Sequence, residues 1–347
     1  MTIPPQRPVY QLFVGIDIAA TTFTAAWMPL DGRPTSAISL PQSAAGFAAL
    51  HAHLQGTGVA PSATLIVLEA TSSYWIALAV HLHAAGYVVS IANPAKVHHY
   101  AKSLPRRGKS DPLDAQVLTL FAAERRPEPW TPPPAIDHEL RQRLMARDGL
   151  LEMRKQAKNQ LHALVQWPVV VPAVQQQLEE VIASLDAQIR VLDEAIAEVL
   201  ATGAWAASAA LLQSVPGIGV LTAAWLLVTT VQFRLCPTAE AAVGYAGLNP
   251  LEGSSGTSLQ RRLAIGHGGN RRLRTALYLA SMSATQHNPV IKAFYERLRA
   301  AGKPPKVARC AAARKLLCLA WAVVTKEEMF DPTVAEERQA AARALAA

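Results

Sequence analysis

Four acidic side chains stand at positions that are difficult to explain as ordinary surface charge. Asp17 interrupts an apolar, strand-like segment and Glu69 ends the apolar run at 64–68, where an acid loses hydration and is costly without a partner. Asp111 and Asp114 are three residues apart at the expected start of a helix, which places them on one face. Converging carboxylates repel one another unless a cation neutralises them, and Mg²⁺ or Mn²⁺ takes such hard oxygen ligands. The set therefore predicts a divalent metal site.

Such a site would suit phosphoryl transfer. Two metal ions about 4 Å apart would stabilise the attacking and the leaving oxygen, which is polynucleotide chemistry. The pair Asp111 and Asp114 also has a simpler explanation, because acids at helix starts act as caps and are favoured by the helix dipole. Asp17 and Glu69 lack that explanation. The loop just before the pair is basic and carries Arg106, Arg107 and Lys109.

Positive charge gathers in the last third of the chain. The 347 residues carry a net charge of +8, and residues 261–315 hold 13 Lys or Arg and one acid, Glu296. A solvated helix face of mixed charges would not show this imbalance. Solubility or a membrane-surface patch are alternatives, but the basic residues alternate with apolar helical stretches, which favours a nucleic acid as partner.

The N-terminal part alternates strand and helix patterns. Strands are expected within 11–29, as a hairpin, and at 35–40, 64–69 and 87–92, the last stopped by Asn93-Pro94; helices are expected at 43–56, 74–85 and 111–125. A basic loop is expected at 102–109. This order predicts a mixed sheet with flanking helices.

The remainder reads as helical. A proline-rich linker at 127–134 precedes two long amphipathic helices at 137–167 and 172–200, suited to an antiparallel hairpin or coiled coil. From residue 207 the chain is helical with loops, and Pro216–Gly219 forms a tight turn that could bind a phosphate or be an ordinary corner. The predicted domains are 1–126, 127–205, 206–330 and a helical or disordered tail at 331–347.

Several classes of protein are disfavoured. The three cysteines, Cys236, Cys310 and Cys318, lack CxxC spacing, so neither a disulfide framework nor a zinc site is indicated. No stretch approaches the roughly 20 apolar residues of a membrane span, and the N-terminus lacks the pattern of a secretory signal. We expect a cytoplasmic protein without a membrane partner.

With these residues in place, the sequence resembles the DEDD-type insertion-sequence transposases, which are serine-dependent recombinases guided by a bridge RNA. That family's RuvC-like, ribonuclease-H-type domain is matched in order by GIDIAATTF, LIVLEATSSYW and KSDPLDAQVLTLFA, which contain the four acids. Its second conserved domain is matched by VPGIG, YAGLNPLEGSSG, IGHGGNRRLRTAL and NPVIKAFYERLRAAGKPPKVA. The resemblance covers nearly the whole chain and implies an α/β domain, a helical hairpin and a mostly helical C-terminal domain.

The resemblance also implies a nucleophile. The family's catalytic serine precedes its IxxxGxxxLR motif, and the matching stretch is Gly253–Gly256, so the nucleophile is expected at Ser255, with Ser254 as the alternative. From the residues alone, a serine between glycines is usually a turn residue. With the family, the metal held by the four acids activates the scissile phosphate and Ser255 attacks it, giving a covalent link to DNA.

Partners follow from the same resemblance. They are donor and target DNA and a structured guide RNA that selects both by base pairing. Further copies of the chain are also expected, as dimers that assemble into a tetramer. The protein would be nucleoid-associated when DNA is bound. His267 lies where the family often has a basic residue, and its role is open. The residues expected to hold phosphates are Arg106, Arg107, Lys109, Arg261, Arg262, Arg271, Arg272, Arg274, Lys303, Lys306, Arg314 and Lys315.

Three other functions fit parts of the pattern. A junction-resolving nuclease would use the same four acids with water as nucleophile and Ser255 as a structural residue. A sugar-kinase or actin-like ATP-binding fold would explain GIDIAATT but not the basic C-terminal region. A nucleic-acid-binding protein without catalysis would be unaffected by Asp17→Asn.

Overall fold

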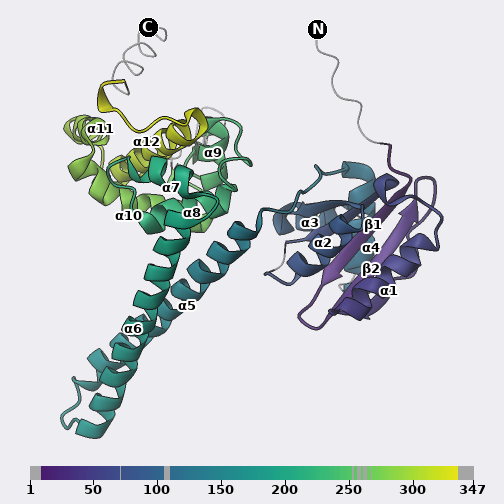
Figure 1. Cartoon of the computed structure of the whole chain (residues 1–347), viewed down its shortest axis with the longest axis horizontal. Coiled ribbons are helices and arrows are strands. Elements are labelled where there is room, and N and C mark those ends of the chain that lie inside the picture. Colours follow the sequence, from purple (N-terminus) through teal and green to yellow (C-terminus); the bar gives the residue numbers. More distant parts are fainter. Residues whose placement is uncertain are drawn as a thin grey trace. The chain divides into compact units, whose positions relative to one another are not determined.

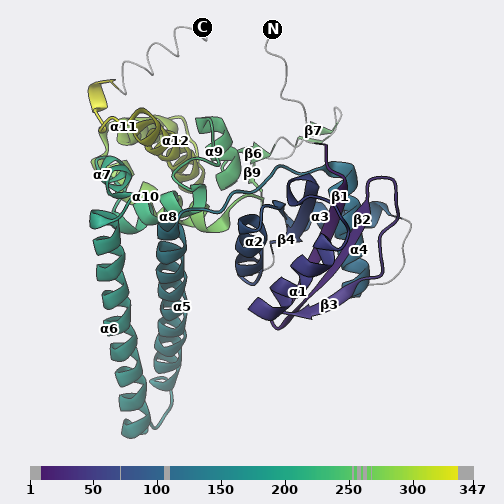
Figure 2. The ribbon, with the colours of Figure 1, turned by 45° about the vertical axis from the view of Figure 1, so that its right-hand side comes forward.

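The computed structural model of the chain describes residues 9–70, 72–104, 110–251, 254–255, 259–260, 264–266 and 268–334. Contacts divide it into two compact units, an N-terminal unit (Met1–Pro132) and a C-terminal unit (Pro133–Ala347), each drawn in Figures 1 and 2. The narrower domain boundaries at residues 126, 205 and 330 remain a prediction.

The N-terminal unit is built on one mixed sheet. Its strands are β1 (Leu12–Ile18), β2 (Thr22–Pro29), β3 (Ile38–Pro41), β4 (Thr64–Glu69) and β5 (Val88–Ala92). The strand order is β3-β2-β1-β4-β5; β1, β2 and β3 pair antiparallel, whereas β1, β4 and β5 pair parallel. The mixed sheet expected from the sequence is confirmed.

Helices cover both faces of this sheet (Figure 1). On one face, α1 (Ala44–Gln55) and α2 (Trp75–Ala84) pack on the even-numbered residues of β1, such as Val14 and Ile16. On the other face, α3 (Pro94–Ser103) and α4 (Asp111–Arg125) pack on Phe13, Leu65 and Val67. A short 3-10 turn, η1 (Pro61–Ala63), leads into β4. Successive strand residues point to opposite faces, so the sheet is buried on both sides.

A close backbone approach fixes α4 on the sheet. A Cβ at Gly15 would overlap the backbone of Ala115, Leu118 and Thr119, so glycine allows α4 to lie directly on β1. The buried Thr119 hydroxyl accepts a hydrogen bond from the Gly15 amide at 3.1 Å and lies 2.9 Å from the carbonyl oxygens of both Ala26 and Ala115. One side chain therefore joins β1, β2 and α4.

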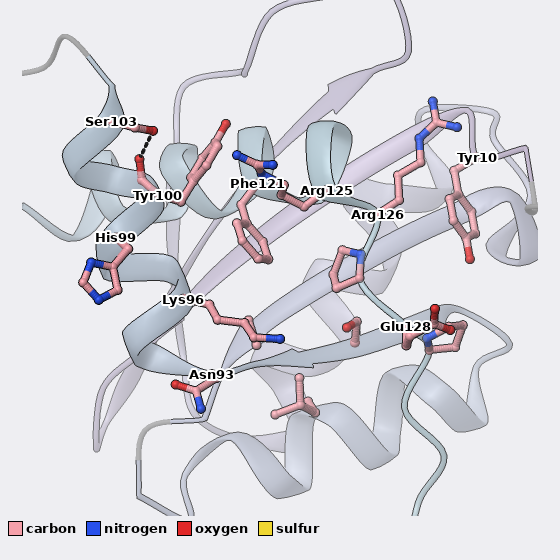
Figure 3. A pocket seen from close by; sticks show the side chains of 15 residues that line it. Tyr10, Asn93, Lys96, His99, Tyr100, Ser103, Phe121, Arg125, Arg126 and Glu128 are labelled. Carbon is pink, nitrogen blue, oxygen red and sulfur yellow. Dashed lines mark hydrogen bonds between the residues drawn. The ribbon is translucent and has the colours of Figure 1, made fainter. Parts of the chain in front are cut away.

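The helix α3 was not expected from the sequence. Asn93-Pro94 was interpreted only as the end of β5, yet the Asn93 side chain also accepts a hydrogen bond from the Ala95 amide at 2.8 Å and caps the helix. Pro94 occupies the first helical position, where its missing N–H costs nothing. Lys102, predicted to begin a loop, lies on α3, whose side chains are seen in Figure 3.

The C-terminal unit begins with the predicted helical hairpin. The helices α5 (Ala135–Leu164) and α6 (Pro172–Thr202) run antiparallel, side by side (Figure 2), and ion pairs cross between them from Arg147 to Asp193 and from Arg154 to Asp186. At the base of the hairpin, Arg141 bonds the fully buried Asp137.

The rest of the C-terminal unit is a helical cluster around one core. Its helices are α7 (Ala206–Gln213), α8 (Val220–Thr230), α9 (Ala239–Ala246), α10 (Arg271–His287), α11 (Pro289–Ala300) and α12 (Pro305–Lys326). The predicted turn at 216–219 joins α7 to α8. There Gly217 has φ of +103°, and a Cβ on it would overlap Ala284 of α10, so packing explains this glycine.

Within the described ranges, no single helix is both long and apolar enough to cross a membrane. The helices α6 and α7, bent by 108° relative to each other, reach that length and composition only when taken together.

The contacts of the Thr119 hydroxyl predict that the stability of the N-terminal unit depends on this one oxygen atom. Thr119→Val keeps the shape but leaves the Gly15 amide without its acceptor, and we expect a loss of about 1–3 kcal/mol in the free energy of unfolding. Urea denaturation gives this value, and hydrogen–deuterium exchange of the β1 amides localises it.

Thr119→Ser is the matched control, because it retains the hydroxyl and removes only the methyl group. Equal stability and equal β1 exchange for Thr119→Val and the unaltered protein would contradict the role assigned to the hydroxyl.

Candidate functional site

The sheet places Asp17 and Glu69 side by side. Each follows by two residues a position that faces α3 and α4: Asp17 follows Gly15 in β1, and Glu69 follows Val67 in β4. They therefore lie on that same face. The parallel register pairs Ile16 with Leu68, so the next residue of each strand is one of the two acids, at the carboxyl ends of β1 and β4.

The helix α4 brings the second pair of acids to this edge. Its middle is docked on Gly15, and its first turn holds Asp111 and Asp114. The N-cap is Ser110 and not Asp111, and in the described part of the chain neither acid is hydrogen-bonded to a free amide of the first turn. The explanation of Asp111 as the N-cap is therefore wrong, whereas both acids do lie in the first turn, where the helix dipole favours them.

The other three acids contribute to the electrostatic environment of Asp17. The pKa of Asp17 is raised to about 6 by burial, the largest cause, together with the negative charges of Asp114, Asp111 and Glu69, in that order. A hydrogen bond with the Ile18 amide opposes the shift. Asp17, Asp111 and Asp114 form no ion pair with any described Lys or Arg. These three carboxylates therefore have no described cation that neutralises them.

The cluster fits a divalent cation in the kind of its donors. Mg²⁺ and Mn²⁺ prefer carboxylate oxygens, and mutual repulsion is what a bound cation would relieve. Among the described residues, however, no three His, Cys, Asp or Glu side chains lie close enough together to hold a metal ion in their present conformations. A complete ligand shell therefore requires side-chain movement.

The predicted nucleophile lies in a small pair of antiparallel ladders. β6 (Pro250–Leu251) pairs with β9 (Ala264–Ile265), and β7 (Ser254–Ser255) pairs with β8 (Leu259–Gln260), with Ser255 opposite Leu259. The backbone of Ser254 and Ser255 is thus a strand within a hairpin, whereas the sequence suggested a loop.

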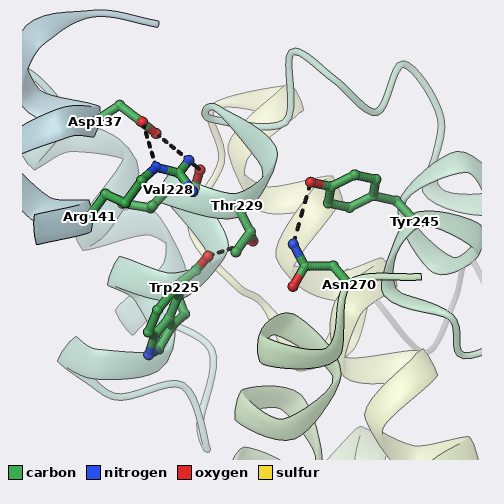
Figure 4. A network of polar contacts seen from close by, with 7 residues as sticks. All are labelled: Asp137, Arg141, Trp225, Val228, Thr229, Tyr245 and Asn270. Carbon is green, nitrogen blue, oxygen red and sulfur yellow. Dashed lines mark hydrogen bonds and ion pairs between the residues drawn. The ribbon is translucent and has the colours of Figure 1, made fainter. Parts of the chain in front are cut away.

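Two glycines and an arginine hold the base of this hairpin. Gly247 and Gly269 both have positive φ, and a Cβ on either would overlap the other loop. Arg274 donates hydrogen bonds to the carbonyl oxygens of Ala246 at 3.1 Å and Gly268 at 2.7 Å, so it joins the chain entering the hairpin to the chain leaving it. The Tyr245 hydroxyl and the Asn270 amide nitrogen, 3.4 Å apart, add a further link (Figure 4).

The predicted phosphate-binding residues have varied surroundings. Arg271 is exposed, whereas Arg272 pairs with Asp148 and lies over the Trp225 ring. Lys303, Lys306 and Arg314 are exposed, and the Lys315 ammonium lies 4.6 Å from the Phe294 ring centroid. Five of the predicted residues, and also His267, lie outside the described residues: Arg106, Arg107, Lys109, Arg261 and Arg262.

The sequence did not reveal the positioning role of two residues, Thr119 and Arg274. Thr119 gave no signal beyond being a polar residue in an apolar helix, because its partners are about a hundred positions away. Arg274 was interpreted only as a phosphate ligand, and its two carbonyl partners show that it also organises the backbone.

The sheet order, the helices on both faces and the acids at the ends of β1, β4 and the start of α4 define a RuvC-like, ribonuclease-H-type domain. Sequence comparison agrees. Residues 14–167 match a transposase family of the DEDD type found in IS110, and residues 209–296 match the transposase IS116/IS110/IS902 family.

Full-length relatives point the same way. The chain is 31% identical over 327 residues to the pilin gene-inverting proteins of Moraxella lacunata and Moraxella bovis, which covers 93% of this chain and 99% of each of them. It is 36% identical over 184 residues to an insertion element IS110 protein of Streptomyces coelicolor, covering 52% of this chain and 41% of that protein. The chain belongs to the IS110-type DEDD transposase family, and this membership implies a DNA-recombining enzyme.

The raised pKa of Asp17 predicts that the acid destabilises the metal-free chain. A carboxyl group whose folded pKa is about 6 instead of 3.8 binds its proton more tightly when folded, so stability falls as the pH rises from about 4 to about 6 and stays lower above that. The shift corresponds to at most about 3 kcal/mol, and solvent screening of this partly buried group reduces that to about 1 kcal/mol. We expect Asp17→Asn to raise the melting temperature in EDTA at pH 7.5.

At pH 4, where Asp17 is largely protonated, the same substitution should have little effect. Asp31→Asn, at an exposed turn, is the control and should change neither value. A lower melting temperature for Asp17→Asn at pH 7.5 would contradict the repulsion seen in the structure.

The arginine at the base of the hairpin gives a second prediction for this region. Arg274→Ala removes two hydrogen bonds from a charged donor, and we expect a loss of about 2 kcal/mol in stability with faster hydrogen–deuterium exchange at residues 246–250 and 264–270. Arg271→Ala, in the same first turn of α10 but exposed, is the matched control. Equal exchange in the two variants would mean that Arg274 does not hold the hairpin.

Proposed function

We propose that this protein is the transposase of an insertion sequence that cuts and rejoins DNA through a serine nucleophile, with an RNA guide choosing donor and target. The observation that carries the proposal is the shared environment of the four acids: burial and the other three charges raise the pKa of Asp17 to about 6. Family membership supports DNA as the substrate.

The chemistry would be a transesterification. The Ser255 hydroxyl oxygen forms a bond to the scissile phosphorus as the bond to a deoxyribose oxygen breaks, and the hydroxyl proton ends on that oxygen. The reverse step rejoins a strand, and because one phosphodiester replaces another, no external energy source is needed. Bound Mg²⁺ or Mn²⁺ would supply Lewis-acid activation of the phosphate. The residues that would hold it are Asp17, Glu69, Asp111 and Asp114.

Rejoining is favoured over simple hydrolysis by the relatives. The two Moraxella proteins are named for gene inversion, and an inversion requires both cutting and joining of strands. A junction-resolving nuclease would use the same acids with water as nucleophile and would leave the serine without a chemical role.

Assembly of several copies is part of the proposal. The far end of the α5–α6 hairpin exposes Trp167 and Val169, at 67% and 78% of their surface, although both are large apolar side chains. Contiguous exposed apolar side chains mark interaction surfaces. We infer that the hairpin joins copies into dimers, and that these form the tetramer expected from the family.

Phosphate contacts would come from the basic C-terminal region. The exposed cations Arg271, Lys303, Lys306 and Arg314 would hold nucleic-acid backbone without reading sequence. Sequence choice would then rest on base pairing by the guide RNA, and the protein would act in the cytoplasm at the nucleoid.

A denaturation-resistant adduct between protein and DNA tests the mechanism. Purified protein with its co-purifying RNA, Mg²⁺ and labelled DNA carrying the element's ends should give a labelled band that survives denaturing electrophoresis. The adduct should be lost in Ser255→Ala and in Asp17→Asn, and it should persist in Asp31→Asn. Loss in Ser254→Ala with retention in Ser255→Ala would move the nucleophile to Ser254.

Cleavage without any adduct would contradict the serine mechanism. If cleavage then persisted in both serine variants but not in Asp17→Asn, the enzyme would be a water-using nuclease. If no nucleic-acid activity depended on Asp17, the acids would not be catalytic.

A further inference from the structure

A cavity of about 800 Å³ opens on the α3–α4 face of the N-terminal unit (Figure 3). It lies between α3, the carboxyl end of β5 and the last turn of α4, with the chain after α4 as its far wall. Its volume falls within the roughly 300–1,000 Å³ typical of small-molecule sites. Arg125 and Arg126, which line it, stand at the opposite end of α4 from Asp111 and Asp114, on the order of 20 Å away along the helix. On its β5 side the cavity adjoins the acid-bearing sheet edge, because Ala92 pairs with Glu69.

Cations surround the cavity. Lys96 of α3 extends into it, and Arg125 and Arg126 line it at the end of α4 (Figure 3). In the part of the chain that the structure describes, none of the three is paired with a carboxylate. Glu128 is the only acid among the lining residues, so the cavity has a net positive charge.

Aromatic rings hold two of these cations and form the inner wall. The Arg125 guanidinium lies 5.7 Å from the ring centroid of Tyr100, and that ring packs edge-on against Phe121 at 5.4 Å. The Arg126 guanidinium lies 5.8 Å from the ring centroid of Phe13. The Phe13 ring packs edge-on against Tyr10, which lines the other side of the cavity. Such cation–π contacts restrict the guanidinium groups and keep them beside the opening.

Phosphate-binding cations next to aromatic rings are the combination that recognises nucleotides. Lysine and arginine hold the phosphate, and flat apolar rings accept the base. A base inside a duplex is paired and stacked, so only an unpaired nucleotide could enter a cavity of this kind.

We propose that the α3–α4 cavity binds one unpaired nucleotide of a nucleic-acid strand, with Lys96 and Arg125 on its phosphate and the base against the wall formed by Tyr100 and Phe121. The inference rests on the proposed function in that it takes a nucleic acid to be the partner. It adds a second contact point on the N-terminal unit that the carboxylate chemistry does not require. Single-stranded DNA and RNA share this chemistry.

Binding of short oligonucleotides tests the proposal. The full-length chain, freed of co-purifying nucleic acid at high salt, is titrated with labelled 12-nucleotide single-stranded DNA, single-stranded RNA and a duplex of the same sequence. The variant carries Lys96→Ala and Arg125→Ala. The matched control carries Lys155→Ala and Lys158→Ala, which remove two exposed cations from α5.

We expect the variant to bind at least one single strand about tenfold more weakly than the control at 0.1 M salt. Its plot of log affinity against log salt should be shallower by about 1.4, because two phosphate contacts are lost at roughly 0.7 each. The strand with the greater loss identifies the natural partner, and the duplex should change less. A 5-iodouracil strand should crosslink to a peptide that contains Tyr100 or Phe121.

Three results would overturn the proposal. The variant could bind single strands as tightly as the control does, it could lose as much affinity for the duplex as for the single strands, or crosslinks could be confined to other peptides. Asp31→Asn, at an exposed turn of the same unit, should bind all three probes as the unaltered protein does. If the unaltered protein bound no probe at all, the nucleic-acid function itself would fail together with this inference.

Discussion

The site depends on how closely α4 can approach β1. Gly15 lets the backbone of the helix lie on the strand, and the Thr119 hydroxyl satisfies the Gly15 amide while it contacts the carbonyl oxygens of Ala26 and Ala115. Because Asp17 follows two residues later, near the carboxyl end of β1, the first turn of α4 must lie beside that carboxylate. A larger side chain at Gly15 would move Asp111 and Asp114 away from it.

This docking has an electrostatic cost. Burial and the three neighbouring carboxylates raise the pKa of Asp17, and among the described residues no Lys or Arg forms an ion pair with it. A fold selected for stability alone would place a cation or an apolar residue there. In the C-terminal unit, a close backbone approach also depends on glycine. Gly247, Gly269 and Arg274 secure both ends of a hairpin whose strands are only two residues long.

The sequence revealed those features whose signal is local. Asp17 and Glu69 stood out because one acid interrupts an apolar strand and the other ends one; that both lie on one face came from the structure. The helix α3 was missed because Asn93-Pro94 ends a strand and caps a helix with the same two residues. The hydrogen bonds of Thr119 join residues 93 and 104 positions apart, and the ion pair of Arg272 with Asp148 spans 124, so neither could be inferred from spacing.

We propose that Asp17, Glu69, Asp111 and Asp114 together bind divalent metal, and metal-directed cleavage of the protein is the sharpest test. Fe²⁺ substituted at the site, with ascorbate and peroxide, generates hydroxyl radicals that cut the nearby backbone. The account predicts cuts near residues 17, 69 and 111–114, segments that are distant in sequence, and their suppression by excess Mg²⁺. Cuts at only one of these segments, or cuts that Mg²⁺ does not suppress, would contradict it.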